Sequence, residues 1–377
     1  TCTVLFAFLL LLPAGAEEAT GAAESVEESG FGAIREFRES LPPEVTALLP
    51  DGFFGEDPET VASAVQNAAD VPKILAYIRD FLGVSLRQAL PLLAAVSGIL
   101  VLSAVLRAVG ATSGAGTGRA FSFCSVTVLT LLLLRQSLSG VSRLRAWFEM
   151  LCTLAGSMLP MMGTLYALGG NVGAAAANHT VMSVFLSVAQ MLCTRAVLPV
   201  AGICLLLAVC DALTGRAALK PLGNLIKRTF TLGFSFLMLL LSFLLGLQTT
   251  LAAGSDTLAL RTVRFAAGSF LPVVGGSVSE AMKTVAGSIS YLRTLAGSGG
   301  ILVLFLFFLP TFLTVLTTRI VFLLCGALAE LLEAKSEGRV LSELASVYGF
   351  FLAVIAAVFT MAVFALTIFA HCAVAGG

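Results

Sequence analysis

The chain has little charge for its length. Of its 377 residues only 12% are charged and 58% are hydrophobic, whereas about 25% of a typical soluble domain is charged. A chain this long and this apolar cannot hide its hydrophobic surface in one water-soluble core. The composition therefore predicts an all-α, polytopic helical membrane protein.

The sequence also lacks the motifs of common enzymes. It contains no Walker A sequence, no GxGxxG fingerprint and no GxSxG elbow. Its two histidines, His179 and His371, are far apart, and no His, Cys, Asp and Glu cluster has metal-ligand spacing. Seven of the eight cysteines lie in apolar stretches without a CxxC pair, as packing residues do. We expect no enzymatic activity, no cofactor and no metal site.

Acidic and basic residues are concentrated in different parts of the chain. Residues 17–80 hold 14 of the 22 acidic residues and four basic ones, a net charge of −10. The rest of the chain carries +10. An acidic front segment repels a polyanion, so nucleic acid is not expected as a partner.

The first 86 residues differ from the rest. Residues 1–16 combine an apolar run with Pro13 and a small-residue Ala14-Gly15-Ala16 site, which is typical of a secretory signal peptide. Residues 17–86 would then form an acidic extracytoplasmic domain of short helices. Pro42-Pro43 is expected to end one helix, and Pro58 to begin another.

Long uncharged stretches follow, and about 20 apolar residues suffice to cross a bilayer. We predict six spans, with two further interrupted segments around Pro160 and Pro272, or six to eight membrane segments in all. The uncharged stretches are Gln88–Leu106, Ala120–Leu134, Met150–Thr194, Ala196–Cys210, Thr229–Ser255, Thr294–Thr318 and Leu344–Gly377.

A short internal repeat organises this region. Residues 155–163 (AGSMLPMMG) return as residues 267–275 (AGSFLPVVG), with six of nine positions identical. Each copy precedes an arginine-bearing apolar segment, a Gly-Arg linker and a long uncharged stretch. We predict the first two membrane helices in residues 87–140, one repeat in 141–255 and a second in 256–377. Chance similarity between apolar segments is the alternative.

The LPxxG element of each repeat supplies the first candidate site residues: Pro160 and Gly163, and Pro272 and Gly275. Proline removes a backbone donor and glycine weakens a helix, so freed carbonyls need protein or water partners at membrane depth. These segments are candidates for re-entrant or kinked helices that line a cavity. The alternative is a plain kinked span packed by small residues.

Arg195 and Arg319 are the other candidates, for cavity lining or coupling. An arginine near the centre of a span costs about 2.5–3.5 kcal/mol on insertion scales, and such residues usually face a pore or a partner. Asp211 and Glu330, at the ends of the same segments, are plausible partners. Snorkelling to an interface is the structural alternative.

The orientation of the repeats depends on whether the LPxxG segments cross the membrane. Non-crossing segments give parallel repeats and six spans, with eight of sixteen lysines and arginines beyond Arg79 on the cytoplasmic side once Arg195 and Arg319 are left out. Crossing segments give inverted repeats, with six of these sixteen lysines and arginines on the cytoplasmic side. The positive-inside rule favours the parallel arrangement, although Arg135, Arg143 and Arg145 then conflict with it.

Residues 264–275 (RFAAGSFLPVVG) and 277–280 (SVSE) carry a resemblance to a known family. From about Leu151 to its end, the chain resembles the stage III sporulation protein AE family. Residues 158–163 (MLPMMG), with the following Gly169-Gly170, are similar to the family too, as are the leader, the acidic front domain and the order of spans.

The resemblance implies a non-enzymatic, permease-like component of the channel complex that links mother cell and forespore. The partners it implies are a secretion-type ATPase, ring-forming proteins of the intermembrane space and membrane lipid. It implies a multi-pass protein of the mother-cell membrane around the forespore, with the N-terminal domain outside the cytoplasm. The alternative is an autonomous secondary transporter of a small solute.

Cysteine labelling from either side of the membrane at Gly170 and Ser298 tests the parallel arrangement. In the parallel, six-span protein both positions should be labelled from the same side. Labelling from opposite sides would reject it.

Overall fold

In a computed structural model of the chain, the described residues are 32–55, 58–113, 115–168, 221–236 and 295–372. Scattered positions between 183 and 210, with residues 239 and 243, are also described. These residues form helices joined by turns and contain no β-strand. The predicted all-α class is confirmed for this part of the protein.

The N-terminal part is a small group of short helices. Residues 32–40 are helical, followed by α3 (Pro43–Thr46) and α4 (Pro58–Ala68). Proline begins α3 and α4, where its missing N–H leaves no hydrogen bond unmade. The helices pack around buried Phe37, Phe53, Val61 and Val65. The predicted helix end at Pro42-Pro43 and helix start at Pro58 are confirmed.

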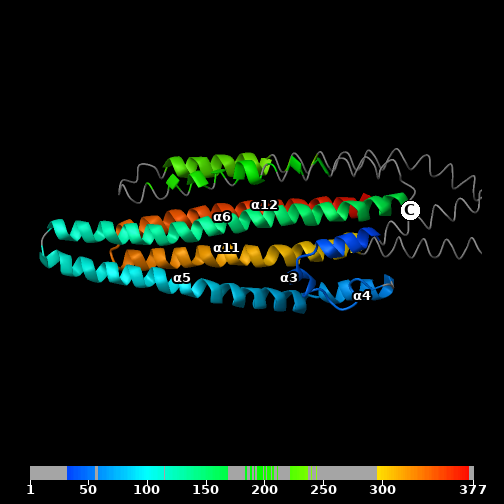
Figure 1. The fold of residues 1–377 in the computed structure, drawn as a ribbon, viewed down its shortest axis with the longest axis horizontal. Helices are drawn as coiled ribbons and strands as arrows, with labels where there is room; N and C mark the ends of the chain where they lie inside the picture. Colours follow the sequence, from blue (N-terminus) through cyan, green and yellow to red (C-terminus); the bar gives the residue numbers. More distant parts are fainter. Residues whose placement is uncertain are drawn as a thin grey trace, which may run out of the picture.

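Four long helices form the body of the protein: α5 (Val71–Ser113), α6 (Ala115–Leu168), α11 (Gly300–Leu331) and α12 (Lys335–Cys372). Figure 1 shows them side by side as an elongated bundle, with α3 and α4 toward one end. A π-helical turn, η2 (Leu295–Gly299), leads into α11, and another, η1 (Cys193–Val197), lies outside the bundle.

Contacts between distant residues fix the directions of the four helices. Ser85 lies beside Thr314 and Arg107 beside Leu332, so α5 and α11 run parallel. Ser125 on α6 meets Glu337, and Gly140 faces Tyr348, so α6 and α12 run parallel to each other and opposite to the first pair.

A tight turn joins α11 to α12. The N–H of Ala334 bonds to the carbonyl of Ala329, and that of Glu333 to Glu330, which is the Schellman arrangement of helix ends. Glu333 takes the left-handed conformation (φ 56°) that glycine usually supplies here. The α5–α6 turn extends past this turn along the bundle (Figure 1).

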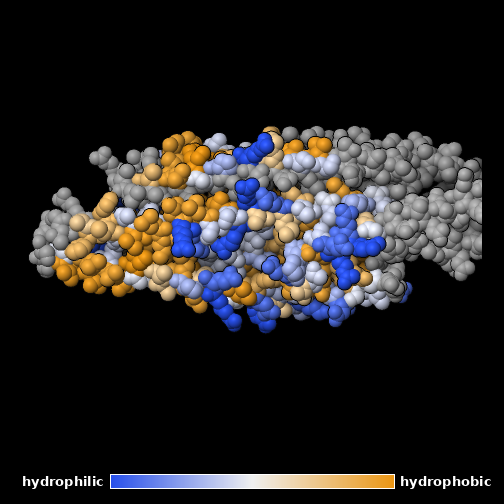
Figure 2. Space-filling model, viewed as in Figure 1, coloured by the Kyte–Doolittle hydropathy of each residue, from blue (hydrophilic) through white to orange (hydrophobic). Residues whose placement is uncertain are grey.

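Leucine and phenylalanine fill the centre of the bundle. Leu100, Leu129, Leu154, Phe322 and Phe351 are almost fully buried. Large apolar side chains also remain on the surface, among them Leu102, Val105, Phe123, Val128 and Leu131. Figure 2 shows apolar side chains gathered toward the α5–α6 turn and hydrophilic ones across the middle of the molecule. An exposed apolar surface of this kind suits lipid.

Among the described residues, four helices are long and apolar enough to cross a membrane: Val71–Gly110, Phe123–Thr164, Gly297–Leu331 and Lys335–Thr367. They contain or overlap five of the predicted uncharged stretches, because Phe123–Thr164 overlaps both Ala120–Leu134 and Met150–Thr194. The stretches between 169 and 294 lie largely outside the described residues, so the total of six to eight segments and the repeat stay predictions.

The helices are longer than a bilayer needs. At 1.5 Å per residue, the 43 residues of α5 and the 54 of α6 extend about 65 and 80 Å, against a hydrocarbon core of about 30 Å. The predicted domain boundaries after residues 86 and 140 both fall inside these continuous helices. The boundary after residue 255 and the leader, residues 1–16, lie outside the described residues.

Phe322→Ala tests the packing of the bundle. Phe322 is fully buried and its ring meets Tyr348 edge-on, with centroids 5.1 Å apart. Removing the ring should lower the free energy of unfolding by about 3 kcal/mol through the cavity it leaves. Leu323→Ala on the exposed face of the same helix is the control. Thermal unfolding in detergent should show a clear loss for the first variant only, and equal effects would contradict this packing.

Candidate functional site: a half-open polar cavity among the helices

A cavity of about 380 Å³ lies among the four long helices and α3. The cavity is bounded by these residues: Glu44, Gln88, Gly140, Arg143, Leu144, Pro310, Thr311, Thr314, Val315, Thr318, Tyr348 and Phe351. More than half of them are polar, although the surrounding helices are apolar. The cavity is half open: Glu44, Gln88 and Arg143 are exposed, whereas Thr318 and Tyr348 are buried. Polar groups gathered among such apolar helices mark a candidate functional site.

The α11 wall of the cavity is a row of threonines that follows Pro310. Thr314 donates its hydroxyl hydrogen to the carbonyl of Pro310, and Thr318 to that of Thr314, each at 2.8 Å. The hydroxyls are thus satisfied within their own helix and keep lone pairs free to accept. Pro310 has no N–H, so the carbonyl four residues before it loses its usual donor. This wall offers hydrogen-bond acceptors.

The opposite wall depends on a glycine. A Cβ at Gly140 would lie 2.7 Å from the hydroxyl oxygen of Tyr348, so only glycine lets the tyrosine hydroxyl lie there. Ser137 and Arg143 lie close to the same hydroxyl. Ser137 and Tyr348 face each other without good hydrogen-bond geometry, because neither oxygen has a partner in the described structure.

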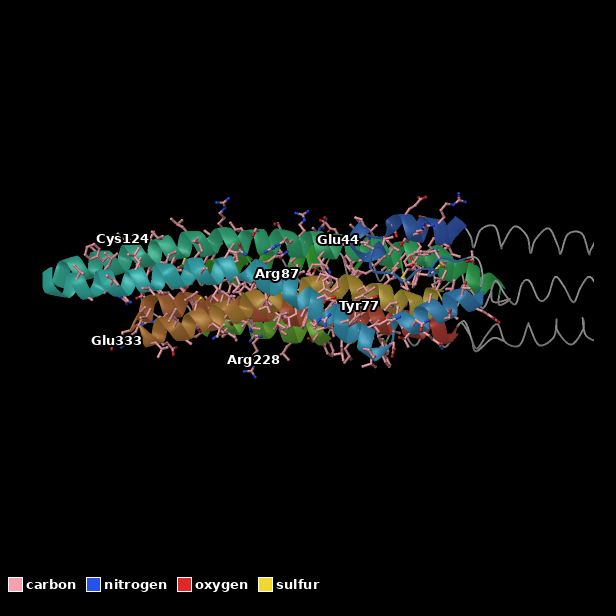
Figure 3. All side chains as sticks on the ribbon, turned by 90° about the horizontal axis from the view of Figure 1, so that it is seen from below. Glu44, Tyr77, Arg87, Cys124, Arg228 and Glu333 are labelled. Atoms are coloured by element: carbon pink, nitrogen blue, oxygen red, sulfur yellow. The ribbon has the colours of Figure 1, made fainter. Side chains whose placement is uncertain are left out.

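Two charges of opposite sign line the cavity. Arg143 reaches it from α6, and Glu44 from α3 of the N-terminal part, where Figure 3 shows it beside the bundle. Neither forms an ion pair with another described residue. The cavity therefore joins the N-terminal helices to the long bundle, with an unpaired charge on each part.

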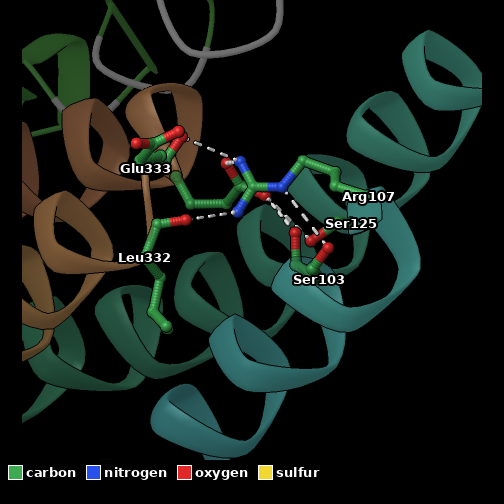
Figure 4. A network of polar contacts seen from close by, with 6 residues as sticks. Ser103, Arg107, Ser125, Leu332 and Glu333 are labelled. Carbon is green, nitrogen blue, oxygen red and sulfur yellow. Dashed lines mark hydrogen bonds and ion pairs between the residues drawn. The ribbon is translucent and has the colours of Figure 1, made fainter. Parts of the chain in front are cut away.

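A second polar cluster lies near the α11–α12 turn (Figure 4). The carboxylate of Glu337 is fully buried and accepts hydrogen bonds from Ser103 (2.6 Å) and Ser125 (3.1 Å). Arg107 lies 3.8 Å from its other oxygen. The guanidinium also donates to the carbonyls of Leu332 and Glu333, at the end of α11. One acid and one base thus connect all four helices.

A third polar contact holds the helical residues 221–236 to the bundle. Lys227 donates to the hydroxyl of Ser346 at 2.7 Å and lies 3.5 Å from the carboxylate of Glu343. Both charged side chains are buried, whereas the neighbouring Arg228 points away from the bundle (Figure 3). The pair places this helix against α12.

The predicted site residues that the structure describes do not line this cavity. Pro160 and Gly163 are partly buried in α6, and the helix runs through them to Leu168. The first LPxxG therefore does not interrupt its helix, which is the continuous-span alternative. Arg195 lies exposed in η1. Pro272 and Gly275 lie outside the described residues.

Arg319 is the predicted residue nearest the cavity. It follows the cavity-lining Thr318 on α11, and its guanidinium packs where a Cβ at Gly349 would meet it at 3.1 Å. Its Nε is buried and has no partner in the described structure. Glu330 lies about 16 Å further along the same helix, too far to pair with it. Asp211 lies outside the described residues.

Sequence reasoning missed Gln88, Arg143, Glu337, Tyr348 and the threonines. The threonine row carried a signal, because Thr311, Thr314 and Thr318 share one helical face. Arg143 also carried a signal, because the parallel arrangement puts this basic residue on the side where the positive-inside rule does not expect it. In the described residues, no group of His, Cys, Asp and Glu is arranged to hold a metal ion.

The fold and the cavity define a class: a helical protein with four described helices long and apolar enough to cross a membrane, and a half-open polar cavity among them. The chain belongs to the stage III sporulation protein AE family, whose model matches residues 59–373. This membership confirms the resemblance and supports a role in sporulation.

A curated relative, "Stage III sporulation protein AE" of Bacillus subtilis (strain 168), is 24% identical over 148 residues. The match spans 39% of this chain and 37% of the relative. No solved structure is similar to the chain.

Arg107→Met tests the buried ion pair. The change leaves the Glu337 carboxylate buried without an opposite charge, which should cost on the order of 3 kcal/mol of folding free energy. Glu337→Gln keeps an oxygen that can accept from Ser103 and should cost about 1 kcal/mol. The control, Arg145→Met, breaks an exposed pair with Glu149 and should cost about 0.3 kcal/mol. Unfolding in detergent measures all three, and an Arg107 variant as stable as the control would contradict the cluster's role.

Proposed function

We propose that this protein is a non-enzymatic, permease-like membrane component of the channel complex that links mother cell and forespore. The supporting observation is the half-open polar cavity among Gln88, Arg143, Thr314 and Tyr348, which lies among helices long and apolar enough to cross a membrane. Membership of a sporulation family supports the setting.

The cavity suits polar cargo. Its α11 wall offers oxygen acceptors, and its α6 wall offers the donors of Arg143 and the hydroxyl of Tyr348. A space of about 380 Å³ is in the range of small-ligand pockets. In the proposed role the cavity forms part of a path for polar solutes or a surface that responds to them.

Partners would supply the energy and the rest of the path. We propose a secretion-type ATPase on the cytoplasmic side and ring-forming proteins in the intermembrane space. The protein would lie in the mother-cell membrane around the forespore, with its N-terminal helices outside the cytoplasm. Glu44 brings those helices to the cavity, so a partner bound to them would act directly on it.

Thr314→Trp tests the use of the cavity. The indole would fill the space between α11 and the Tyr348 wall, whereas Ile320→Trp on the exposed side of the same helix would not. In a sporulating strain lacking the native gene, the first variant should lower heat-resistant spore yield to that of the null strain, and the second should not. Immunoblots of membranes check equal amounts.

Two outcomes would contradict the proposal. Normal sporulation with Thr314→Trp would show that the cavity is not used. Movement of a small solute by the purified protein alone in liposomes, without a co-purifying ATPase or ring protein, would support an autonomous secondary transporter instead.

A further inference from the structure

Five buried polar atoms in the described structure have no hydrogen-bond partner. They are Thr130 Oγ1, Ser137 Oγ, Arg319 Nε, Glu337 Oε2 and the hydroxyl of Tyr348. All five lie on α6, α11 and α12, inside one bundle. Buried polar groups in native proteins are nearly always satisfied by protein or by ordered water, so five in one interior need an explanation.

The five atoms lie at successive heights along the bundle axis. Glu337 meets Ser125, and Thr130 lies five residues further along α6, a rise of about 8 Å. Ser137 lies about 10 Å beyond Thr130 by the same rise. Ser137 is close to Tyr348, and Arg319 packs beside the next residue of α12, Gly349.

The row begins at the buried Glu337 cluster and ends at the cavity, because Tyr348 is a cavity-lining residue. From Glu337 to Tyr348, α12 rises about 17 Å, against a hydrocarbon thickness of about 30 Å. The unsatisfied groups thus extend over about half the depth of a bilayer.

The chemistry of the row favours one ligand. Hydroxyls can donate and accept, the Glu337 oxygen accepts, and the Arg319 Nε donates. Water is the small molecule that satisfies all of these, and two or three waters spaced by about 2.8 Å bridge each gap. Calcium would need six or more oxygen ligands in one place, and magnesium a near-ideal octahedron, which a spaced row does not supply.

We propose that a file of ordered water joins the polar cavity to the carboxylate of Glu337. The file gives a fully buried acid access to protons in the cavity, through hydrogen-bonded water. It is a property of this chain alone, and it stands whether or not the cavity serves a channel complex.

Magnetisation transfer from water to carbon-13-labelled side chains, measured by solid-state NMR on the full chain in liposomes, tests the file. Thr130 and Ser137 should receive magnetisation several-fold faster than Thr317. Thr317 is the matched control, because it is equally buried but donates its hydroxyl to the carbonyl of Leu313 at 2.8 Å. Transfer to Thr130 and Ser137 as slow as to Thr317 would overturn the proposal.

Isosteric variants give a second, independent readout. In a dry bundle, Thr130→Val and Ser137→Ala remove unsatisfied polar atoms and should raise the thermal midpoint. With water present, the same changes remove a partner from that water, so the midpoint should fall or stay unchanged. The thermal midpoint of the Thr317→Val variant should fall in either case. A rise for both test variants would overturn the water file.

Discussion

The bundle depends on one carboxylate. Glu337 of α12 is bonded to α5 through Ser103, to α6 through Ser125 and, by way of Arg107, to the end of α11. In lipid, apolar side chains gain little by meeting each other, so packing and polar contacts decide how helices associate. A buried pair of this kind adds little net stability, but a helix shifted by one turn would leave the charge without partners. Glu337 therefore sets the register of all four helices.

The remaining polar groups follow from the same constraint. The threonines of α11 satisfy their hydroxyls on their own helix, and Gly140 removes the side chain that would displace the Tyr348 hydroxyl. Lys227 and Glu343 neutralise each other at the outer surface of α12. The groups that the protein does not satisfy gather between Glu337 and the cavity, where the structure concentrates its polarity.

Much of the fold could be predicted from the sequence. Composition predicts apolar helices, the prolines at 42–43 and 58 mark helix ends and starts, and five uncharged stretches overlap long helices. The site could not be found in this way. Pro160 appeared to be a break, yet helix α6 passes through it, because proline is tolerated where neighbouring helices support the backbone. Glu337 accepts a hydrogen bond from Ser103, 234 positions away, and Arg143 meets residues of other helices only at the cavity. No local sequence pattern contains such pairings.

Helix α5 is continuous and makes a polar contact with another part of the protein near each of its ends. Its first turns lie under the N-terminal helices, where the Tyr77 hydroxyl donates to the carbonyl of Leu48, and Arg107 stands near its other end. Between them, Gln88 faces the cavity. A continuous helix barely changes length, so a tilt imposed at Tyr77 is passed toward Arg107, about 45 Å away by helical rise. Pro91 lies between the two, about one turn past Gln88, and a helix bends most easily at a proline. The bend available to α5 therefore lies beside the cavity.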